Sequence, residues 1–280
     1  MKDIDFVTVV VPILNEEKNL RQCLDRLNRF PHVLVVDSGS TDESLKICNE
    51  FGVTIVDFYW NGKYPKKRNW VLDEGLVTTE WVLFLDADEY ICPVFIEELI
   101  NKLASSKCDG YWVQYENYFL SKRMRWGIQQ RKLALFRTQF RFERVDPGPD
   151  DKMDMEVHEH PVGLGRIGKL STRAEHRDYK GLLHFNRKHA EYAKWEAERF
   201  LNLSDSKSLT LRQKLKYRLI HLPVFPLLYF IVDYFIFLRV FDGKAGYSYS
   251  MHKLFYFQLV GDLIFSKGKK PRTYKDPIHR

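Results

Sequence analysis

The 280-residue sequence lacks the features that define a zinc protein, a disulfide-stabilised secreted protein or a multi-span membrane protein. Its four cysteines lie far apart and form no Cys-x-x-Cys pair, so we expect reduced thiols buried in a core. It has no Gly-x-Gly-x-x-Gly and no P-loop pattern, which disfavours dinucleotide oxidation and P-loop hydrolysis. No apolar run reaches the roughly 20 residues of a spanning helix.

Acidic residues are outnumbered by basic ones, 37 to 44, which gives a net charge of +7. A basic balance attracts phosphate groups of a nucleic acid, a nucleotide or an anionic lipid. No recognised RNA-binding or DNA-binding motif is present, so we expect no nucleic-acid partner. Two acids within Met1–Asp5 replace the positive charge of an export signal, which predicts a cytoplasmic protein.

Strand and helix patterns alternate over the first hundred residues. Continuous β-branched runs predict buried parallel strands, and apolar stripes of helical period separate them. This alternation predicts an α/β fold, with a mostly parallel sheet flanked by helices and ligands at the carboxyl ends of the strands. The strands are expected at residues 7–11, 32–37, 53–56 and 81–86, and the helices at 16–30, 40–51, 66–76 and 93–104.

The pattern changes after residue 110. Residues 111–115 and 132–137 read as strands with mixed faces, and residues 178–203 read as a polar helix spotted with aromatic side chains. A Ser-rich linker follows. We therefore predict a domain over 1–203, with a nucleotide-binding half at about 1–110 and an acceptor half at about 111–203, and a helical extension over 204–280.

The extension is rich in aromatic and aliphatic residues. Of the 22 residues in Leu219–Val240, 17 are apolar or aromatic, but the longest stretch without a formal charge, Leu219–Val232, has 14. A basic tail follows after Lys267. Such a combination suits the surface of an anionic membrane, so we predict peripheral membrane contact through 219–280. The alternative is a helical hairpin that packs on the main domain or on a second subunit.

The sharpest chemical signal is Asp86-Ala-Asp88, which directly follows an apolar strand pattern. If the strand continues, residues two apart point to the same side and both carboxylates face one ligand. Carboxylates at a strand end suit Mg²⁺ or Mn²⁺ shared with substrate phosphates. An Asp-x-Asp triplet also occurs in ordinary turns, so the spacing alone does not decide.

Polar residues also follow the first two strands. Asp37 ends a strand and precedes Gly39, so its carboxylate could accept hydrogen bonds from a base or a ribose. Pro12, Asn15 and Glu16 stand where a nucleotide ring commonly rests. The alternative is capping: Asn15 would cap the first helix, and the segment Ser40–Glu43 would cap the second.

A basic loop, Asn61–Asn69, carries Lys67 and Arg68 just before a helix. It makes a plausible diphosphate clamp, although a solvated run of charge is as reasonable an interpretation.

Together the four motifs resemble family 2 glycosyltransferases of the GT-A fold. The matching segments, in their order and spacing, are Val7–Pro12 with Asn15-Glu-Glu, Val36-Asp37-Ser-Gly-Ser-Thr-Asp42, Lys67-Arg68-Asn69 and Leu85-Asp86-Ala-Asp88-Glu89. The resemblance covers about residues 5–200, and Ser38 departs from it where many members carry a second aspartate. More narrowly, Val157–His160, the region 176–192 and Asp242–Gly246 resemble a bacterial subgroup that builds lipopolysaccharide core and related envelope glycans.

The resemblance implies roles for these residues. Asp37 would hold uracil, Arg68 the nucleotide or its diphosphate, and the Asp-x-Asp motif a Mg²⁺ or Mn²⁺ ion, with Asp88 the more direct ligand. The donor would be a nucleotide-sugar, with UDP favoured by family habit, and the acceptor an envelope glycolipid or oligosaccharide at the inner face of the cell membrane.

An inverting reaction also needs a general base near the acceptor. The resemblance places it in the stretch 150–159, where Glu159 fits best, with Glu156 and Asp154 as reserves. His158 could position a phosphate or the acceptor. The stretch 121–144 contains eight basic residues, among them Arg131, and could form a groove for a phosphorylated glycolipid or simply a solvated surface.

Three other functions remain open on the sequence. The chain could be a catalytically silent membrane scaffold, but its intact Asp-x-Asp motif and Glu159 argue against that. A sugar nucleotidyltransferase is disfavoured, because Pro12–Glu17 stands where such enzymes carry a Gly-rich loop. Sugar transfer to a polyprenyl phosphate is possible, although such enzymes often have clear spanning helices.

Overall fold

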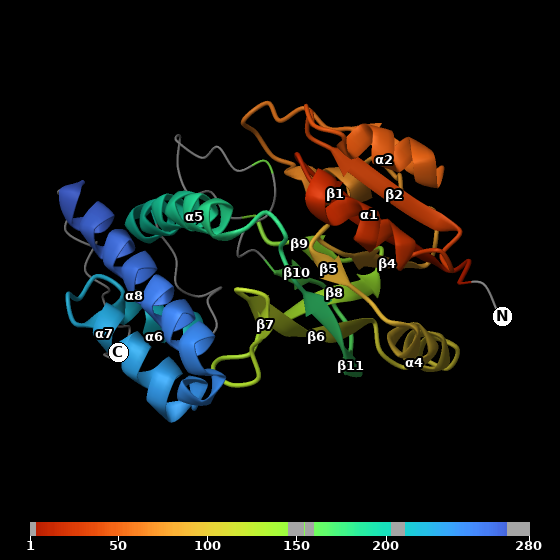
Figure 1. The fold of residues 1–280 in the computed structure, drawn as a ribbon. Helices are drawn as coiled ribbons and strands as arrows, with labels where there is room; N and C mark the ends of the chain where they lie inside the picture. The colour runs from red at the N-terminus through yellow and green to blue at the C-terminus, as the bar shows by residue number, and fades with distance from the viewer. Residues whose placement is uncertain (1–3, 145–153, 155–159, 203–210, 268–280) are drawn as a thin grey trace, which may run out of the picture. The chain divides into compact units, whose positions relative to one another are not determined.

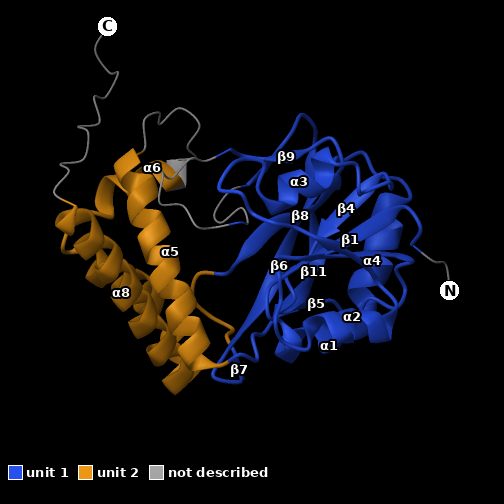
Figure 2. Ribbon diagram, turned by 90° about the horizontal axis from the view of Figure 1, so that it is seen from above, with its two compact units in different colours: residues 1–123, 129–144, 152–180 blue, residues 124–128, 145–151, 181–280 orange. Residues whose placement is uncertain are grey.

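A computed structural model describes residues 4–144, 154, 160–202 and 211–267. The described chain divides into two compact units, which Figure 2 colours separately. The first takes the described residues of 1–123, 129–144 and 152–180, and the second takes 124–128 and the described residues from 181 onward. The C-terminal part of the second unit thus begins at residue 181, whereas the sequence analysis placed a boundary after residue 203.

The first unit is built on a mixed sheet with the strand order β3-β2-β1-β4-β8-β6-β11-β5 (Figure 1). The four strands on the β3 side are parallel, β8 runs antiparallel to both of its neighbours, and β6 and β11 are parallel. The strands are β1 Val7–Ile13, β2 His32–Asp37, β3 Thr54–Asp57, β4 Trp81–Phe84, β5 Glu89–Tyr90, β6 Gly110–Phe119, β7 Lys122–Arg123, β8 Arg131–Arg137, β9 Arg141–Phe142, β10 Pro161–Val162 and β11 Ile167–His176.

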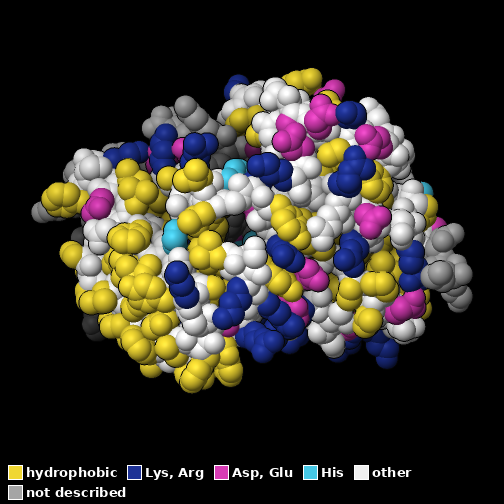
Figure 3. Space-filling view, viewed as in Figure 1, with side chains coloured by type: hydrophobic (Ala, Val, Ile, Leu, Met, Phe, Trp, Pro, Cys, Tyr) yellow, Lys and Arg dark blue, Asp and Glu magenta, His cyan; other side chains and the backbone are white. Residues whose placement is uncertain are grey.

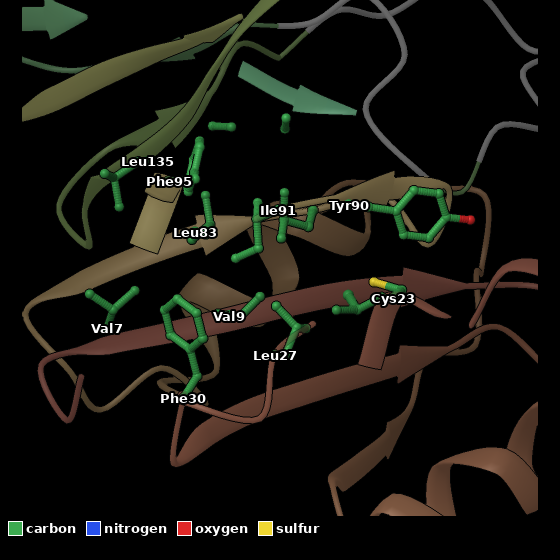
Figure 4. Packing of buried hydrophobic residues seen from close by; sticks show 14 of the residues in the cluster. Val7, Val9, Cys23, Leu27, Phe30, Leu83, Tyr90, Ile91, Phe95 and Leu135 are labelled. Carbon is green, nitrogen blue, oxygen red and sulfur yellow. The ribbon is translucent and has the colours of Figure 1, made fainter. Parts of the chain in front are cut away.

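Helices cover both faces of this sheet, as the alternation predicted. Along β1, Val9 packs in one core cluster and Val10 in the other, because successive side chains of a strand point to opposite faces. Figure 4 shows the first cluster, where Cys23 and Leu27 approach the sheet. The helices of this unit are α1 Glu17–Asp25, α2 Ser44–Phe51, α3 Lys67–Asp73 and α4 Pro93–Leu103.

The second unit is helical. Its core joins α5 to the C-terminal helices through side chains such as Ala193, Ala197, Phe257 and Val260, which explains why α5 groups with this unit. Its helices are α5 Leu182–Asn202, α6 Leu211–Leu219, α7 Phe225–Ile231, a π-helix at Val232–Ile236, a 3₁₀ turn at Arg239–Asp242 and α8 Gly243–Ser266. Among the described residues, no helix combines the length and apolar character needed to cross a bilayer.

The predicted α/β class, the parallel strands and the C-terminal helical extension are confirmed. The main strand that the sequence analysis missed is β11. Its less exposed positions keep the two-residue period, but only Leu170 and Ala174 among them are buried and apolar. The positions between and beside them are glycine, threonine and histidine, so the strand lacks the hydrophobic alternation on which strand prediction depends.

Candidate active site

The loops that follow β1 and β2 are tied to each other. Asn15 takes a left-handed backbone conformation, with φ of 55°, and its amide oxygen accepts a hydrogen bond from the backbone N–H of Thr41 at 2.8 Å. The Ser40 hydroxyl accepts the Asn15 backbone N–H at 2.9 Å, and the Ser44 hydroxyl accepts that of Glu16 at 2.8 Å. The two loops therefore form one rim at the carboxyl ends of their strands.

These contacts correct the capping interpretation for Asn15 and Ser40. Helix α2 begins at Ser44, and it is the Asp42 carboxylate that accepts the first backbone N–H groups of both helices, from Ser44 at 3.0 Å and from Glu17 at 3.1 Å. The side chains of Asn15 and Ser40 join neighbouring loops instead, because each loop is short and has unpaired backbone N–H groups to satisfy.

The Asp37 carboxylate is 2% exposed and closes its own turn. It accepts hydrogen bonds from the backbone N–H of Gly39 at 3.0 Å and of Ser40 at 2.9 Å, and from the Ser40 hydroxyl. Gly39 adopts φ of 89°, which a side chain would disfavour. Asp37 thus sets the shape of this rim, and its contact with a base stays a prediction.

Asp86 sits between two cations. One carboxylate oxygen accepts a hydrogen bond from the Arg68 guanidinium at 2.7 Å, and the other from the Lys132 ammonium at 2.5 Å. Burial alone would raise the pKa of the Asp86 carboxyl, but the charges of Lys132 and Arg68 outweigh it and hold that pKa well below its ordinary value. The lowered pKa favours the ionised carboxylate, which pairs with both cations.

Lys132 also pairs with Glu89, which is buried and receives a hydrogen bond from the Tyr115 hydroxyl at 3.1 Å. Burial raises the pKa of Glu89, with Lys132 opposing that effect. Burial would lower the pKa of Lys132, yet its two carboxylate partners raise it. This cluster of Asp86, Glu89, Lys132 and Arg68 lies where β4 ends.

Asp88 is directed to a different partner. Its carboxylate lies 3.4 Å from Nε2 of His176, and the opposite ring nitrogen of His176 lies 3.0 Å from the Asn117 amide oxygen. Burial would lower the pKa of His176, but the Asp88 charge dominates and raises it. Asn117 therefore fixes the orientation of the ring so that Nε2 faces Asp88.

Asp86 and Asp88 do not lie on one strand, so the prediction that a strand presents both to one ligand is wrong. Strand β4 ends at Phe84, and residues 86–88 form a turn before β5. Asp86 and Asp88 thus bind different side chains. Glu89, which follows the motif directly, is held by Lys132 and Tyr115. The described residues contain no group of three or more His, Cys, Asp or Glu side chains arranged for a metal ion.

The basic loop contributes Lys67 as well as Arg68. The Lys67 ammonium is buried and lies 3.0 Å from the Asp154 carboxylate, which also accepts a hydrogen bond from the Ser38 hydroxyl. The Lys67 backbone N–H donates to the Asp154 carbonyl at 2.9 Å. Asp154 thus connects the residue after β2 to the start of α3, and its role as a base stays a prediction.

Glu16 forms a further pair that the sequence did not predict. It lies 2.6 Å from the Lys180 ammonium and accepts a hydrogen bond from the Asn19 amide at 2.9 Å. Burial raises the pKa of Glu16, and Lys180 opposes that shift. The pair joins the loop after β1 to the segment after β11.

Among the remaining predicted residues that the structure describes, Arg131 is not brought to this cluster. Arg131 precedes Lys132 on β8, so the two side chains point to opposite faces, and the Arg131 guanidinium lies 4.9 Å from the centre of the Trp112 ring. The predicted residues Glu156, His158 and Glu159 lie outside the described residues. Pro12 is buried within β1.

The family model for Glycosyl transferase family 2 matches residues 8–155, just over half of the chain. The chain is similar to the lipopolysaccharide core biosynthesis glycosyltransferase LpsC of Rhizobium meliloti, 29% identical over 61% of this chain and 60% of that protein. It is also similar to the glycosyltransferase GlyA of Streptococcus pneumoniae, 31% identical over 41% of this chain and 17% of that protein. The matches thus span less than two thirds of these relatives.

Two solved structures show a weaker likeness. Glucosyl-3-phosphoglycerate synthase from Mycobacterium tuberculosis is 21% identical, with 41% of this chain and 45% of that chain covered and a TM-score of 0.33. S. aureus TarS residues 1–349 are 17% identical, with 95% and 93% covered and a TM-score of 0.44.

Proposed function

Because this chain belongs to glycosyl transferase family 2, we propose that it transfers a sugar, with inversion, from a nucleotide-sugar to a hydroxyl group of an acceptor. The observation that carries the proposal is the meeting of Asp86, Arg68, Lys132, Asp88 and His176 where β4 ends. Ligands bind at the carboxyl ends of strands in such sheets. At this position the cations Arg68 and Lys132 could offset the charge of a diphosphate. The neighbouring Asp88–His176 pair could hold a metal ion on it.

A divalent cation fits this donor set. Asp88 offers oxygen and His176 offers nitrogen, a combination that suits Mn²⁺, while Mg²⁺ would depend more on Asp88 and on substrate phosphates. With two protein ligands, the remaining positions would be filled by diphosphate oxygens and water. When bound, the ion would neutralise charge on the leaving diphosphate.

The chain's own residues supply the rest of the site. Arg68 is held by Asp86 beside the place proposed for the diphosphate, and it can donate several hydrogen bonds to phosphate oxygens. Asn15, Glu16 and Asp37 shape the rim proposed for the nucleoside, with Pro12 and Lys67 beneath it. Glu159 is proposed as the base that takes the proton of the acceptor hydroxyl, with Glu156 in reserve.

The proposed acceptor is an envelope glycolipid or a lipopolysaccharide-core oligosaccharide, in keeping with the name of the relative LpsC. His158 and Arg131 are proposed to contact its phosphates. UDP is proposed as the nucleotide because it is the usual carrier in the family. Contact with the inner face of the cell membrane through 219–280 belongs to the same proposal.

The reaction is tested by incubating the protein with Mn²⁺, an envelope glycolipid extract and a panel of UDP-, GDP- and dTDP-sugars, and by measuring release of the nucleoside diphosphate. We expect release with one donor class, strong loss in Asp88→Asn, and full activity in Asp25→Asn, which alters an exposed aspartate on α1. Glu159→Gln should abolish transfer while nucleotide binding persists. Absence of release with every donor would contradict the proposal.

A further inference from the structure

The helical unit has an outward face without exposed formal charge. Between Leu222 and Phe241 the chain has only two charged residues, Asp233 and Arg239, and these are 0% and 3% exposed. Twelve of the twenty residues in this stretch are large apolar side chains that are at least 36% exposed, with Ile236 at 68% and Phe241 at 67%. Figure 3 shows hydrophobic side chains gathered over the α7 and α8 region, with few acidic ones among them. We call residues 222–241 the apolar face.

The two charges are turned inward to each other. The Asp233 carboxylate accepts hydrogen bonds from Arg239 Nε at 2.5 Å and Nη2 at 3.1 Å, and from the Ser250 hydroxyl at 2.9 Å. A surface that faces only water normally does the reverse, with charges outward and large apolar side chains inward. An exposed apolar area of this extent is typical of an interaction site.

A distant segment adds a tryptophan to this face. The Asp242 carboxylate accepts the backbone N–H groups of Arg125 at 3.0 Å and Trp126 at 3.1 Å, and the Gly127 N–H donates to the Phe237 carbonyl at 2.7 Å. The Trp126 ring is 43% exposed and lies 5.7 Å from the ring of Phe241. Tryptophan with its apolar body and N–H group is typical of the boundary between lipid and water.

We propose that the apolar face, with Trp126, inserts into one leaflet of an anionic lipid membrane. Two exposed cations lie beside it and would contact lipid phosphates: Lys244 follows Phe241 closely in sequence, and Arg125 precedes Trp126, with its backbone N–H bonded to Asp242. A second copy of the chain is a poorer occupant, because a symmetric pairing of this face would bring like cations together at its edge. The inference rests on the membrane contact of the proposed function and specifies the surface that makes it.

The test is flotation of the full chain with vesicles of phosphatidylcholine alone and with added phosphatidylglycerol. We expect binding to the anionic vesicles and a loss of roughly tenfold or more in Ile236→Ser/Phe241→Ser, because two large apolar groups no longer leave water. Both side chains are exposed, so the fold should persist, as circular dichroism can check. The matched control is Tyr59→Ser/Leu164→Ser, which removes exposed apolar groups from the other unit, 78% and 96% exposed, and should bind as the wild type does.

Replacing the cations tests the lipid charge separately. Arg125→Gln/Lys244→Gln should lower binding to anionic vesicles by about fivefold per cation, at roughly 1 kcal/mol each. Equal vesicle binding by wild type and Ile236→Ser/Phe241→Ser would overturn the inference. The inference would also be overturned if the wild type did not bind vesicles and instead formed dimers that Ile236→Ser/Phe241→Ser does not form. Vesicle binding needs no nucleotide-sugar, so the result is independent of whether sugar transfer is observed.

Discussion

At the scale of single residues, the site depends on which of two adjacent cations faces inward. Lys132 meets Asp86 and Glu89, while Arg131 points to the opposite face of β8 and lies against Trp112. The sequence showed a stretch with eight basic residues but not which of them would reach an acid. That choice follows from the pairing of β8 with β4, which is a long-range contact.

Replacing Lys132 with methionine should destabilise the protein, because it leaves Asp86 and the buried Glu89 without their shared cation. We expect a loss of about 2–3 kcal/mol in unfolding free energy by urea titration, below the range for a fully buried pair because the Lys132 side chain is partly exposed. The control Lys102→Met breaks a single, longer pair with Glu98, at 3.8 Å between two half-exposed residues of one helix, and should cost under about 1 kcal/mol. Equal losses of unfolding free energy in the two variants would contradict a stabilising role of Lys132 beyond that of an ordinary surface pair.

His189 predicts a dependence of stability on pH. Burial, assisted by the charge of Lys253, whose ammonium lies 3.1 Å from the ring, lowers the pKa of His189 to about 3. The unfolded chain protonates this histidine near pH 6.5, so below that pH the unfolded state binds more protons than the folded state. This contribution to stability is therefore present above pH 6.5 and is lost as the pH falls toward 3.

The measurement is urea unfolding of wild type and His189→Gln at pH 7, 6 and 5. Well below pH 6.5, stability of the wild type should fall by up to about 1.4 kcal/mol more per pH unit than that of the variant. Parallel pH profiles would contradict the assignment of a neutral, half-buried His189.

At the scale of elements, the sequence predicted the parallel strands better than the turns between them. Alternating and β-branched runs located β1, β2 and β4 because burial imposes those patterns. The turn at Asp86–Asp88 was mistaken for a continuing strand. Its geometry depends on Lys132 and His176, which come from strands far along the chain. His176 was hidden for the same reason as β11, in which few of the inward positions are apolar.

The connection from α7 to α8 depends on the buried Asp233–Arg239 pair. Asp233→Ala would leave the Arg239 guanidinium uncompensated and would also remove the acceptor of the Ile128 backbone N–H. We expect a loss of about 3–5 kcal/mol in unfolding free energy. Asp262→Ala, at an exposed position on α8, should change it by less than about 0.5 kcal/mol. A mild effect of Asp233→Ala would mean that the connection is held by its apolar contacts.

At the scale of the whole molecule, the two units have different proposed functions. The sheet unit holds the cluster proposed for the nucleotide-sugar, and the helical unit carries the apolar face. Composition already separated them, because the C-terminal third is rich in aromatic residues. Composition could not show that Asp233 and Arg239 pair with each other, because a sequence does not reveal which way a charged side chain points. The segment 155–159 with Glu159 lies outside the described residues, so the base remains a prediction.

The most direct test of the account is calorimetric titration of UDP into the protein with Mn²⁺ and with EDTA. We predict binding that requires the metal, weakened at least about tenfold in Asp88→Asn and in His176→Gln, and unchanged in Asp25→Asn. Binding of GDP or dTDP under the same metal requirement would change only the donor. If no nucleotide binds under any condition, or if binding ignores both EDTA and the two substitutions, the proposed site is contradicted.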